Sequence, residues 1–282
     1  MAAISAGETP SLPGGVNAYA NFYYIFDEIG NYMGIIGGTL GYNILKRLSP
    51  NGNNSSMDGS VYIGKSKLAT LLGPKIWDEV VGKVVIDFGC GEGSEAIEIA
   101  QHGARKVIGL DIQENFLEIG RARAVQEGLS GKCIFELKSD EKADLITAID
   151  SFEHFNDPSS ILTTMSQLVK PSGCILVAFG PTWYHPLGGH LFSVFPWAHL
   201  IFTEKALIRW RSDFKTDGAT RFCEVAGGLN QMTIARFEKI VASSPFRFSE
   251  FETVPIRKLA AVSNRLTREF TTAIVRCKLV LR

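Results

Sequence analysis

The chain has 282 residues, of which 45% are hydrophobic and 21% are charged, and its formal net charge at pH 7 is zero. This composition is sufficient for a sizeable buried core and is ordinary for a soluble α/β domain with additions. Zero net charge gives no general attraction to nucleic acid or to an anionic bilayer. We therefore expect neither a nucleic-acid partner nor stable membrane insertion, although a local charged patch would not appear in the total.

The cysteines lie far apart in the sequence and show no C-x-x-C spacing: Cys90, Cys133, Cys174, Cys223 and Cys277. Their odd number excludes a complete intramolecular disulfide framework. A reducing compartment is therefore expected, and the chain is interpreted as cytoplasmic.

Residues 1–64 are expected to form an N-terminal tail and cap segment. The first stretch lacks the basic and apolar regions of a signal peptide. An aromatic stretch that includes Tyr23 follows, and then an uncharged run between Glu28 and Lys46. This run is too short and too rich in glycine for a membrane helix. It is interpreted as a packed cap or a subunit contact, through which the chain could form a homo-oligomer.

A loop over residues 50–60 and a helix over residues 65–81, interrupted at Gly73-Pro74, lead into the central motif. The motif, residues 87–93, reads Asp-Phe-Gly-Cys-Gly-Glu-Gly; it ends a short apolar run and precedes a helical pattern. This order predicts a strand, a tight turn and a helix. The glycines let the backbone turn sharply and lie close to a ligand. A second acid, Asp111, ends the next strand about twenty residues on, where the hydroxyls of a ribose need an acceptor.

The glycine spacing distinguishes two classes of nucleotide-binding enzyme. A dinucleotide-binding oxidoreductase has G-x-G-x-x-G, with a helix N-terminus facing a pyrophosphate. Here the spacing is G-x-G-x-G, Ser94 stands where the third dinucleotide glycine would fall, and Asp87 precedes the loop. An acid at this strand end suits an ammonium group better than a phosphate. The nicotinamide oxidoreductase is therefore the less favoured alternative.

Asp87, the glycine loop and Asp111 together resemble motifs I and II of the class I S-adenosylmethionine-dependent methyltransferases, in the group of small-molecule enzymes similar to methyltransferase type 11. The resemblance implies S-adenosylmethionine as cofactor. It assigns the following residues to cofactor binding: Asp87, Phe88, Gly89, Cys90, Gly91, Gly93, Asp111 and Ile112.

Residues 65–180 are predicted to form the cofactor-binding core, because strands and helices alternate there and imply a parallel sheet covered on both faces. After the central motif, strands are expected over 107–110, 133–137, 144–149 and 174–179, and helices over 94–102, 114–127 and 158–169. A turn is expected over 170–173. The short connection over 138–143 indicates that the usual crossover helix is reduced or absent. By resemblance, Asp140 with Ser139 is the candidate there for holding the adenine amino group.

The fourth core strand leads into Asp150-Ser151-Phe152-Glu153-His154, with Asp157-Pro158 close behind. This segment resembles the E-H-x-x-D-P segment of the same methyltransferase group, which lies under the methionine part of the cofactor and faces the acceptor. The resemblance assigns Asp150 and Phe152 to cofactor binding. Glu153 and His154 become candidates for catalysis.

Residues 181–230 are an insertion rich in aromatic residues, and they follow the fifth core strand directly. The insertion is interpreted as a helical lid whose aromatic side chains mostly pack its own small core, while some line an acceptor pocket. The candidates for contact with the acceptor, including one residue of the N-terminal segment, are Tyr23, Trp183, Tyr184, Phe192 and Trp197.

Four of the five histidines lie between residues 154 and 199. Three interpretations stay open: a metal site, a general base, and ordinary hydrogen-bonding histidines in turns. The spacing of His185 and His190 has no second tight pair to support it, so no metal ligand is assigned. His154, His185 and His190 are the candidates for the base, with Glu153 beside them.

Residues 231–282 are expected to add a helix over 233–244 and two antiparallel closing strands over 247–254 and 270–281. With them, the resemblance implies a Rossmann-like methyltransferase fold. Its seven-stranded, mostly parallel sheet has the order 3-2-1-4-5-7-6, with the helical cap and lid as additions and the ligand outside the carboxyl ends of the strands.

The predicted function is transfer of a methyl group from S-adenosylmethionine to O, C or N of a hydrophobic or aromatic small metabolite, as in natural-product or quinone-type biosynthesis. Two alternatives remain. One is a protein that keeps the cofactor-binding fold as a scaffold or partner subunit without transferring methyl. The other is the nicotinamide oxidoreductase.

Overall fold

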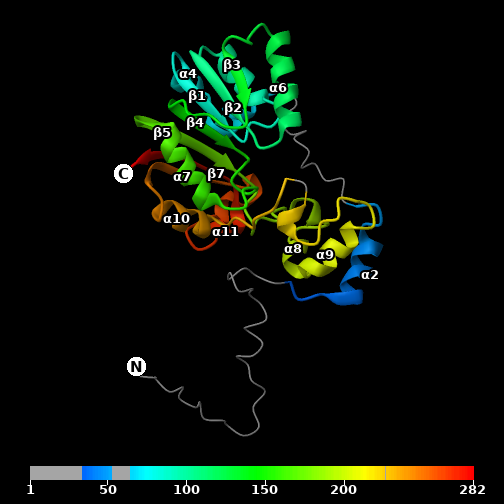
Figure 1. Cartoon of the computed structure of the whole chain (residues 1–282). Coiled ribbons are helices and arrows are strands. Elements are labelled where there is room, and N and C mark those ends of the chain that lie inside the picture. The colour runs from blue at the N-terminus through cyan, green and yellow to red at the C-terminus, as the bar shows by residue number, and fades with distance from the viewer. Residues whose placement is uncertain (1–33, 53–63, 226) are drawn as a thin grey trace, which may run out of the picture.

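The computed structural model describes residues 34–52, 64–225 and 227–282 (Figure 1). Tyr23 and most of the loop expected over residues 50–60 therefore lie outside the described residues. In the described part, a central sheet with helices on both faces carries a smaller helical lobe at its side (Figure 1).

The sheet has seven strands in the order β3-β2-β1-β4-β5-β7-β6. Strand β7 runs antiparallel to β5 and β6, and the other pairings in the sheet are parallel. This order confirms the predicted methyltransferase topology. The strands are β1 (Val84–Phe88), β2 (Lys106–Leu110), β3 (Cys133–Glu136), β4 (Ala143–Ile149), β5 (Val169–Phe179), β6 (Phe246–Pro255) and β7 (Thr272–Leu281).

Each face of the sheet is covered by helices that bury apolar side chains against it. One face is packed by α3 (Lys67–Leu72), α4 (Ile76–Val80), α5 (Ser94–Gln101) and α6 (Glu114–Gln126). The other face is packed by α7 (Pro158–Leu168) and α10 (Ile234–Ala242). Strands buried on both sides explain the nearly continuous apolar runs of β1 and β4.

Local departures from the expected elements have identifiable causes. The helix expected over residues 65–81 is divided into α3 and α4 at Gly73, whose φ of 87° a helix cannot contain. The turn expected over 170–173 is wrong. Val169 already pairs with Ala143, so these residues form an irregularity within β5. The connection between β3 and β4 contains no helix, as predicted.

The helical lobe, defined here as residues 34–52 with 183–225, joins two segments that are far apart in the sequence. Its helical elements are α2 (Gly38–Leu48), η2 (His190–Phe192), α8 (Ala198–Ile201), α9 (Glu204–Arg211) and η3 (Phe222–Glu224). Helix α2 lies beside α9, and they share one apolar cluster (Figure 1). The indole nitrogen of Trp210 donates to the carbonyl oxygen of Ser49 at 2.8 Å. The N-terminal cap and the insertion therefore pack as one unit.

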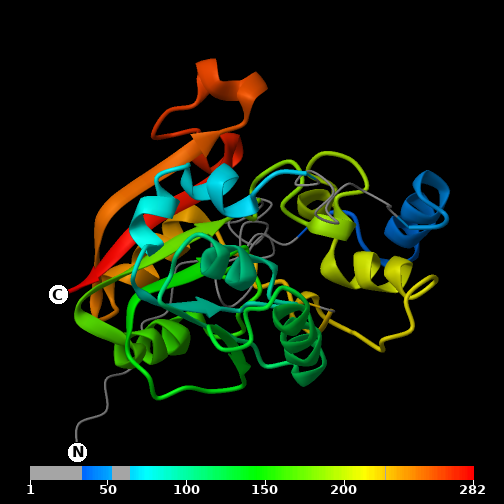
Figure 2. The ribbon, with the colours of Figure 1, turned by 90° about the horizontal axis from the view of Figure 1, so that it is seen from above.

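The β6–β7 connection, residues 256–271, projects from the end of the sheet (Figure 2). It contains η4 (Arg257–Val262) and α11 (Arg268–Thr271), so β7 begins two residues later than expected. Within the described ranges, no helix combines the length and the apolar character needed to cross a bilayer.

Candidate active site

The carboxyl ends of β1, β2 and β4 lie side by side at the centre of the sheet, and three acids gather there. Asp87 lies near the end of β1, where it is in register with Gly109 of β2 and Thr147 of β4. Asp111 follows β2 and Asp150 follows β4. Strands β2 and β3 lie on one side of β1, and the chain then crosses to β4 on the other side. Open α/β sheets bind ligands at the carboxyl ends of the strands where the order reverses in this way.

Asp87 is a buried carboxyl with one satisfied oxygen. Its exposed fraction is 2%. The hydroxyl of Thr147 donates to Oδ1 at 3.0 Å, whereas Oδ2 has no hydrogen-bond partner among the described residues. Burial, and then the charge of Glu95, raise the pKa of Asp87 to about 7. A buried, unpartnered carboxylate oxygen is costly without a donor, so this position is suited to a cationic or hydrogen-bonding ligand group.

Asp111 holds the glycine loop against the end of β2. The backbone N–H of Gly91 donates to Oδ2 and that of Gln113 to Oδ1, both at 2.9 Å. Gly91 has a φ of +50°, and a β-carbon added there would meet no atom within 4 Å. The loop therefore presents an open backbone surface that a ligand can approach closely.

Gly93 serves a different purpose from Gly91. A β-carbon at Gly93 would lie 2.3 Å from the ring of Phe135, and one at Gly109 or Gly120 would also collide with that ring. These glycines make room for a large core side chain of β3. Packing against Phe135 thus explains why residue 93 is a glycine. Direct contact between Gly93 and a cofactor stays a prediction.

The remaining residues predicted to bind cofactor lie in the loops around the same edge. Cys90 is buried, and burial raises the pKa of its thiol. Ile112 is 91% exposed directly after Asp111. Ser139 and Asp140 follow β3, and the Ser139 hydroxyl accepts a bond from the backbone N–H of Glu141 at 3.3 Å. An exposed isoleucine beside this edge offers an apolar surface to a ligand.

Two aromatic residues predicted to bind cofactor belong to the core in this structure. Phe152 is fully buried against the rings of Phe155, Phe179 and Phe237. Phe88 is half-buried, with its ring edge-on to Phe155 at a centroid distance of 6.0 Å. Their rings support the β4 segment from beneath.

The residues after β4 carry buried polar groups. Asp150 has a φ of 46° and forms an ion pair with Lys67 at 3.0 Å. Lys67 also lies 3.7 Å from Glu95. Burial raises the pKa of Asp150, and burial together with the charge of Asp150 raises that of Glu153 well above its usual range. Glu153 is 2% exposed and its Oε2 has no partner among the described residues. Burial therefore favours the neutral form of this carboxyl.

His154 is held at one ring nitrogen and open at the other. Its Nδ1 donates to the carbonyl oxygen of Gly228 at 2.8 Å, and in a neutral ring this places the lone pair on Nε2. The ring of His190 lies edge-on to that of His154, with centroids 5.4 Å apart. His190 has a φ of 51°, and its buried Nε2 has no partner among the described residues. The structure thus brings these predicted histidines together.

The other histidines of this region differ from that pair. His185 uses Nδ1 to accept the backbone N–H of Leu187 at 2.9 Å, which is an ordinary turn contact. His199 is buried between the Ser193 hydroxyl and the carbonyl oxygen of Trp183, at 3.1 and 2.7 Å. Burial lowers the pKa of His185, His190 and His199 to about 4. These rings are therefore neutral at pH 7. In the described part of the chain, no three His, Cys, Asp or Glu side chains are arranged to hold a metal ion.

The aromatic residues predicted to contact an acceptor separate into two pairs. Trp183 and Phe192 are 2% and 1% exposed, and both pack against Phe222 in the core of the lobe. Tyr184 and Trp197 are half-buried, and the Trp197 indole donates to the Tyr184 carbonyl oxygen at 2.9 Å. The packing interpretation therefore accounts for the first pair.

Sequence reasoning missed Asn230 and Lys67. The Asn230 amide donates to the carbonyl oxygens of Phe152 and Phe155, both at 2.7 Å, and its backbone N–H donates to that of Glu153 at 3.0 Å. It fastens the end of the insertion to the segment after β4. Neither residue belongs to a motif, and only their contacts distinguish them.

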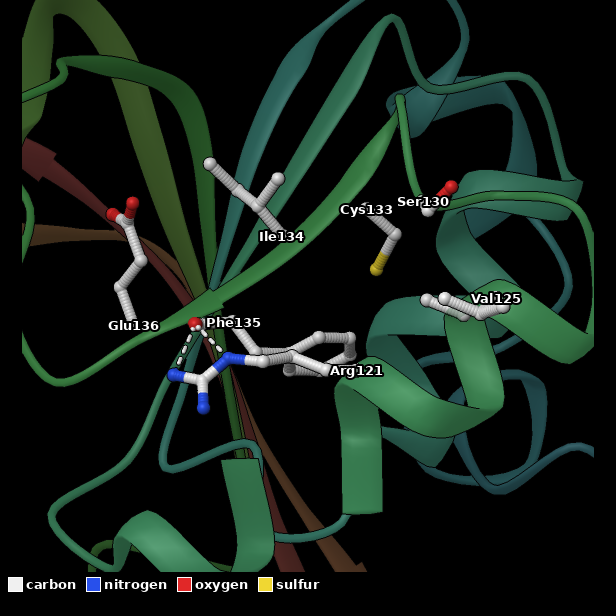
Figure 3. A pocket seen from close by; sticks show the side chains of 8 residues that line it. Arg121, Val125, Ser130, Cys133, Ile134, Phe135 and Glu136 are labelled. Carbon is white, nitrogen blue, oxygen red and sulfur yellow. Dashed lines mark hydrogen bonds between the residues drawn. The ribbon is translucent and has the colours of Figure 1, made fainter. Parts of the chain in front are cut away.

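A separate hollow of about 290 Å³ lies at the outer edge of the sheet, between β3 and α6 (Figure 3). The Arg121 guanidinium donates to the Phe135 carbonyl oxygen at 3.1 and 2.9 Å and closes one side of it. The hollow contains none of the predicted site residues. Its lining is Arg121, Ala124, Val125, Ser130, Cys133, Ile134, Phe135 and Glu136.

Comparison with known proteins identifies a family. Residues 45–214, more than half of the chain, match the family model described as a methyltransferase domain. The chain is 35% identical over 123 residues to the ubiquinone biosynthesis O-methyltransferase of Vibrio campbellii, covering 42% of this chain and 51% of that protein. It is 38% identical over 101 residues to the enzyme of the same name from Acinetobacter baumannii, covering 33% and 42%. The chain thus matches about half the length of these relatives or less.

A solved structure shows the same fold. The magnesium protoporphyrin IX methyltransferase of Synechocystis PCC 6803, crystallised with bound SAH, aligns with a TM-score of 0.50 and 19% sequence identity. The alignment covers 86% of this chain and 95% of that one. The shared fold therefore extends beyond the sheet to most of the chain.

Proposed function

The chain belongs to the methyltransferase-domain family, and on this basis we propose that it transfers a methyl group from S-adenosylmethionine to a hydrophobic or aromatic small molecule. The observation that carries the proposal is the buried, unpartnered Oδ2 of Asp87 beside the open backbone of Gly91. The relatives named for ubiquinone biosynthesis support a phenolic or quinone-type acceptor that is methylated on oxygen.

The residues at the sheet edge fit the chemical groups of this cofactor. Asp87 would accept from its ammonium group, which supplies the missing partner of Oδ2. Asp111 would accept from the ribose hydroxyls, because each of its oxygens has a further lone pair beyond the backbone bond that it already accepts. Ile112 would cover the adenine, and Ser139 or Asp140 would meet its amino group. When bound, S-adenosylmethionine supplies an electrophilic methyl group.

The chain's own contribution is to orient an acceptor and to remove its proton. Positioning a nucleophile in line with the methyl group can supply much of the acceleration. The open Nε2 of His154 and the unpartnered Nε2 of His190 are the nitrogens that could take a hydroxyl proton. Burial favours the neutral form of Glu153, which could donate a hydrogen bond to the acceptor. His185 is the weaker candidate for the base, because its Nδ1 already accepts the Leu187 N–H.

Binding of S-adenosylhomocysteine tests the cofactor site. We expect calorimetry to show binding of S-adenosylhomocysteine and none of NAD. Asp111→Ala should weaken binding at least about tenfold, because it removes a charged hydrogen-bond acceptor and also releases Gly91. Lys142→Gln is the control, an exposed change outside the proposed contacts that should leave the affinity unchanged. Tight binding of NAD alone would refute the proposal.

Turnover tests the histidine pair. With a catechol or hydroquinone acceptor and labelled S-adenosylmethionine, His190→Ala should lower kcat by about a hundredfold or more while the affinity for S-adenosylhomocysteine stays unchanged. His185→Ala should have a smaller effect. His199→Ala should lower thermal stability, since both of its ring nitrogens are bonded. If S-adenosylhomocysteine binds but no acceptor is labelled, the protein is the cofactor-binding scaffold instead.

The cysteines support a reducing compartment, and we propose the cytoplasm. Four of the five cysteines are buried, the exposed one is Cys223, and all five are free thiols. None needs an oxidising environment to complete a disulfide.

A further inference from the structure

The β6–β7 connection projects from the rest of the molecule (Figure 2). Three of its large apolar side chains are exposed. Leu266 is 92% exposed, Val262 57% and Phe270 45%. Scattered single apolar residues on a surface need no explanation. These three belong to one short segment of 16 residues. Within the described residues Leu266 is almost uncovered, whereas the ring of Phe270 packs in part against that of Tyr184.

The same segment carries a concentration of unpaired positive charge. Arg257, Lys258 and Arg265 are exposed, and none of them has an ion pair within the described residues. The one acid of the segment, Glu269, is committed to the N-terminus of α10, where it accepts the N–H groups of Ile234 and Ala235 at 3.0 and 2.8 Å. Because the whole chain has zero net charge, this local excess is a specific feature of the segment.

Hydrogen bonds hold the segment in a defined shape. The Ile256 N–H donates to the Thr271 carbonyl oxygen at 2.7 Å and closes its base. The Thr267 hydroxyl donates to the Val262 carbonyl oxygen at 2.6 Å and closes its tip. Arg268 is tied to Glu238 on α10 at 2.9 and 2.6 Å. The exposed side chains are therefore presented by a preorganised scaffold, which lowers the entropic cost of docking.

We propose that the β6–β7 connection docks this protein on an anionic lipid surface. Leu266 and Val262 enter the boundary between headgroups and acyl chains. Arg257, Lys258 and Arg265 contact the lipid phosphates, with their stems lying along the apolar layer. This is attachment to one leaflet and requires no membrane-spanning helix.

The β6–β7 connection lies next to the aromatic insertion. If the chain methylates a lipophilic acceptor, as proposed above, this position relates lipid binding to that function. The ring centroids of Phe270 and Tyr184 lie 5.2 Å apart. Tyr184 is at the start of the insertion, just beyond β5. The lipid-facing segment therefore adjoins the aromatic insertion, which we expect to cover the acceptor site. A lipophilic acceptor would pass from the bilayer to the site without crossing water.

Vesicle binding of the full chain tests the proposal. In co-sedimentation without cofactor, we expect binding to phosphatidylcholine vesicles that contain phosphatidylglycerol, weak binding to phosphatidylcholine alone, and loss of binding as salt rises. The triple variant Arg257→Gln, Lys258→Gln, Arg265→Gln should bind at least about tenfold more weakly, because each cation near an anionic surface contributes about fivefold. Leu266→Asn should also weaken binding by about tenfold.

Two controls match these variants. The triple variant Lys75→Gln, Lys142→Gln, Lys239→Gln removes the same charge from exposed positions elsewhere, and Val125→Asn removes an apolar side chain that is 66% exposed on α6. Both should bind like the parent. Equal losses in the controls, or no binding to anionic vesicles, would overturn the proposal, as would dimerisation through residues 256–271 without vesicle binding. Vesicle binding by a chain that transfers no methyl would refute only the proposed function.

Discussion

Asp87 illustrates how a residue proposed to bind the cofactor can destabilise the folded chain in the absence of a ligand. Its carboxyl is buried, one of its oxygens has no partner among the described residues, and the nearby Glu95 repels its charge. Such an arrangement raises the pKa and makes ionisation costly in the folded state. We interpret the cost as preorganisation for the ammonium group of the cofactor.

The pH dependence of stability tests this interpretation. The pKa of Asp87 is about 7 in the folded chain, against 3.8 ordinarily, so the folded chain binds more protons between these values. The free energy of unfolding contributed by this group therefore falls as pH rises through the window, and the loss is complete above pH 7. Asp87→Asn should be more stable than the parent above pH 7, by up to about 4 kcal/mol, in urea unfolding. It should also lose affinity for S-adenosylhomocysteine.

Asp144→Asn is the matched control in the neighbouring strand. The Lys170 ammonium lies 2.7 Å from the Asp144 carboxylate and lowers its pKa. Asp144 therefore adds to the free energy of unfolding at neutral pH and loses this contribution as pH falls, which is the reverse of Asp87. This variant should be less stable than the parent at pH 7. If Asp87→Asn were destabilised in the same way, Asp87 would have a partner that the structure does not show.

At the scale of elements, the lobe has its own apolar core, separate from the two cores that cover the sheet. Phe192 is buried in the core of the lobe, and the ring centroids of Phe192 and Phe222 lie 4.7 Å apart. The lobe and the sheet can therefore be destabilised separately.

Phe192→Ala should open the lobe while leaving the sheet intact. Removing a buried phenylalanine costs about 3–5 kcal/mol. Hydrogen exchange should accelerate in α2 and α9 and remain slow in β1 and β4, and S-adenosylhomocysteine should bind as before. Phe270→Ala, which removes a ring that is 45% exposed, should leave exchange in the lobe unchanged. Faster exchange in the sheet of the Phe192 variant would contradict the separation.

At the scale of the whole molecule, the N-terminal cap is held to the insertion by close backbone contact. Ile36 forms a bridge with Phe202, and a β-carbon added at Gly34 would lie 2.0 Å from the Phe202 carbonyl oxygen. The contact is possible only because residue 34 is glycine.

Gly34→Ala should separate the cap from the insertion. We expect it to destabilise the lobe by about 1–3 kcal/mol and to speed proteolysis between α2 and α3. Gly131→Ala is the control, since a β-carbon there meets no atom within 4 Å. Equal melting temperatures and cleavage rates for the two variants would show that the cap does not depend on this contact.

Much of the core could be predicted before the structure was known. The strand, turn and helix around Asp87 and the acid at Asp111 follow from short-range spacing. The remaining core strands follow from apolar runs bounded by turns, and the strand order followed from the family resemblance. The misplaced turn at 170–173 shows the limit of this approach: Lys-Pro-Ser-Gly has turn composition, but pairing of Val169 with β4 outweighed it.

The sequence by itself determined which residues could form a methyl donor site, because glycine spacing and a terminal acid act over a few neighbouring residues. Only the tertiary structure decided that Asp111 fastens the glycine loop, that Gly93 makes room for Phe135, and that His154 meets His190 rather than His185. It also joined the cap to the insertion. These contacts link residues far apart in the chain, and their geometry depends on how whole elements pack, which no local pattern records.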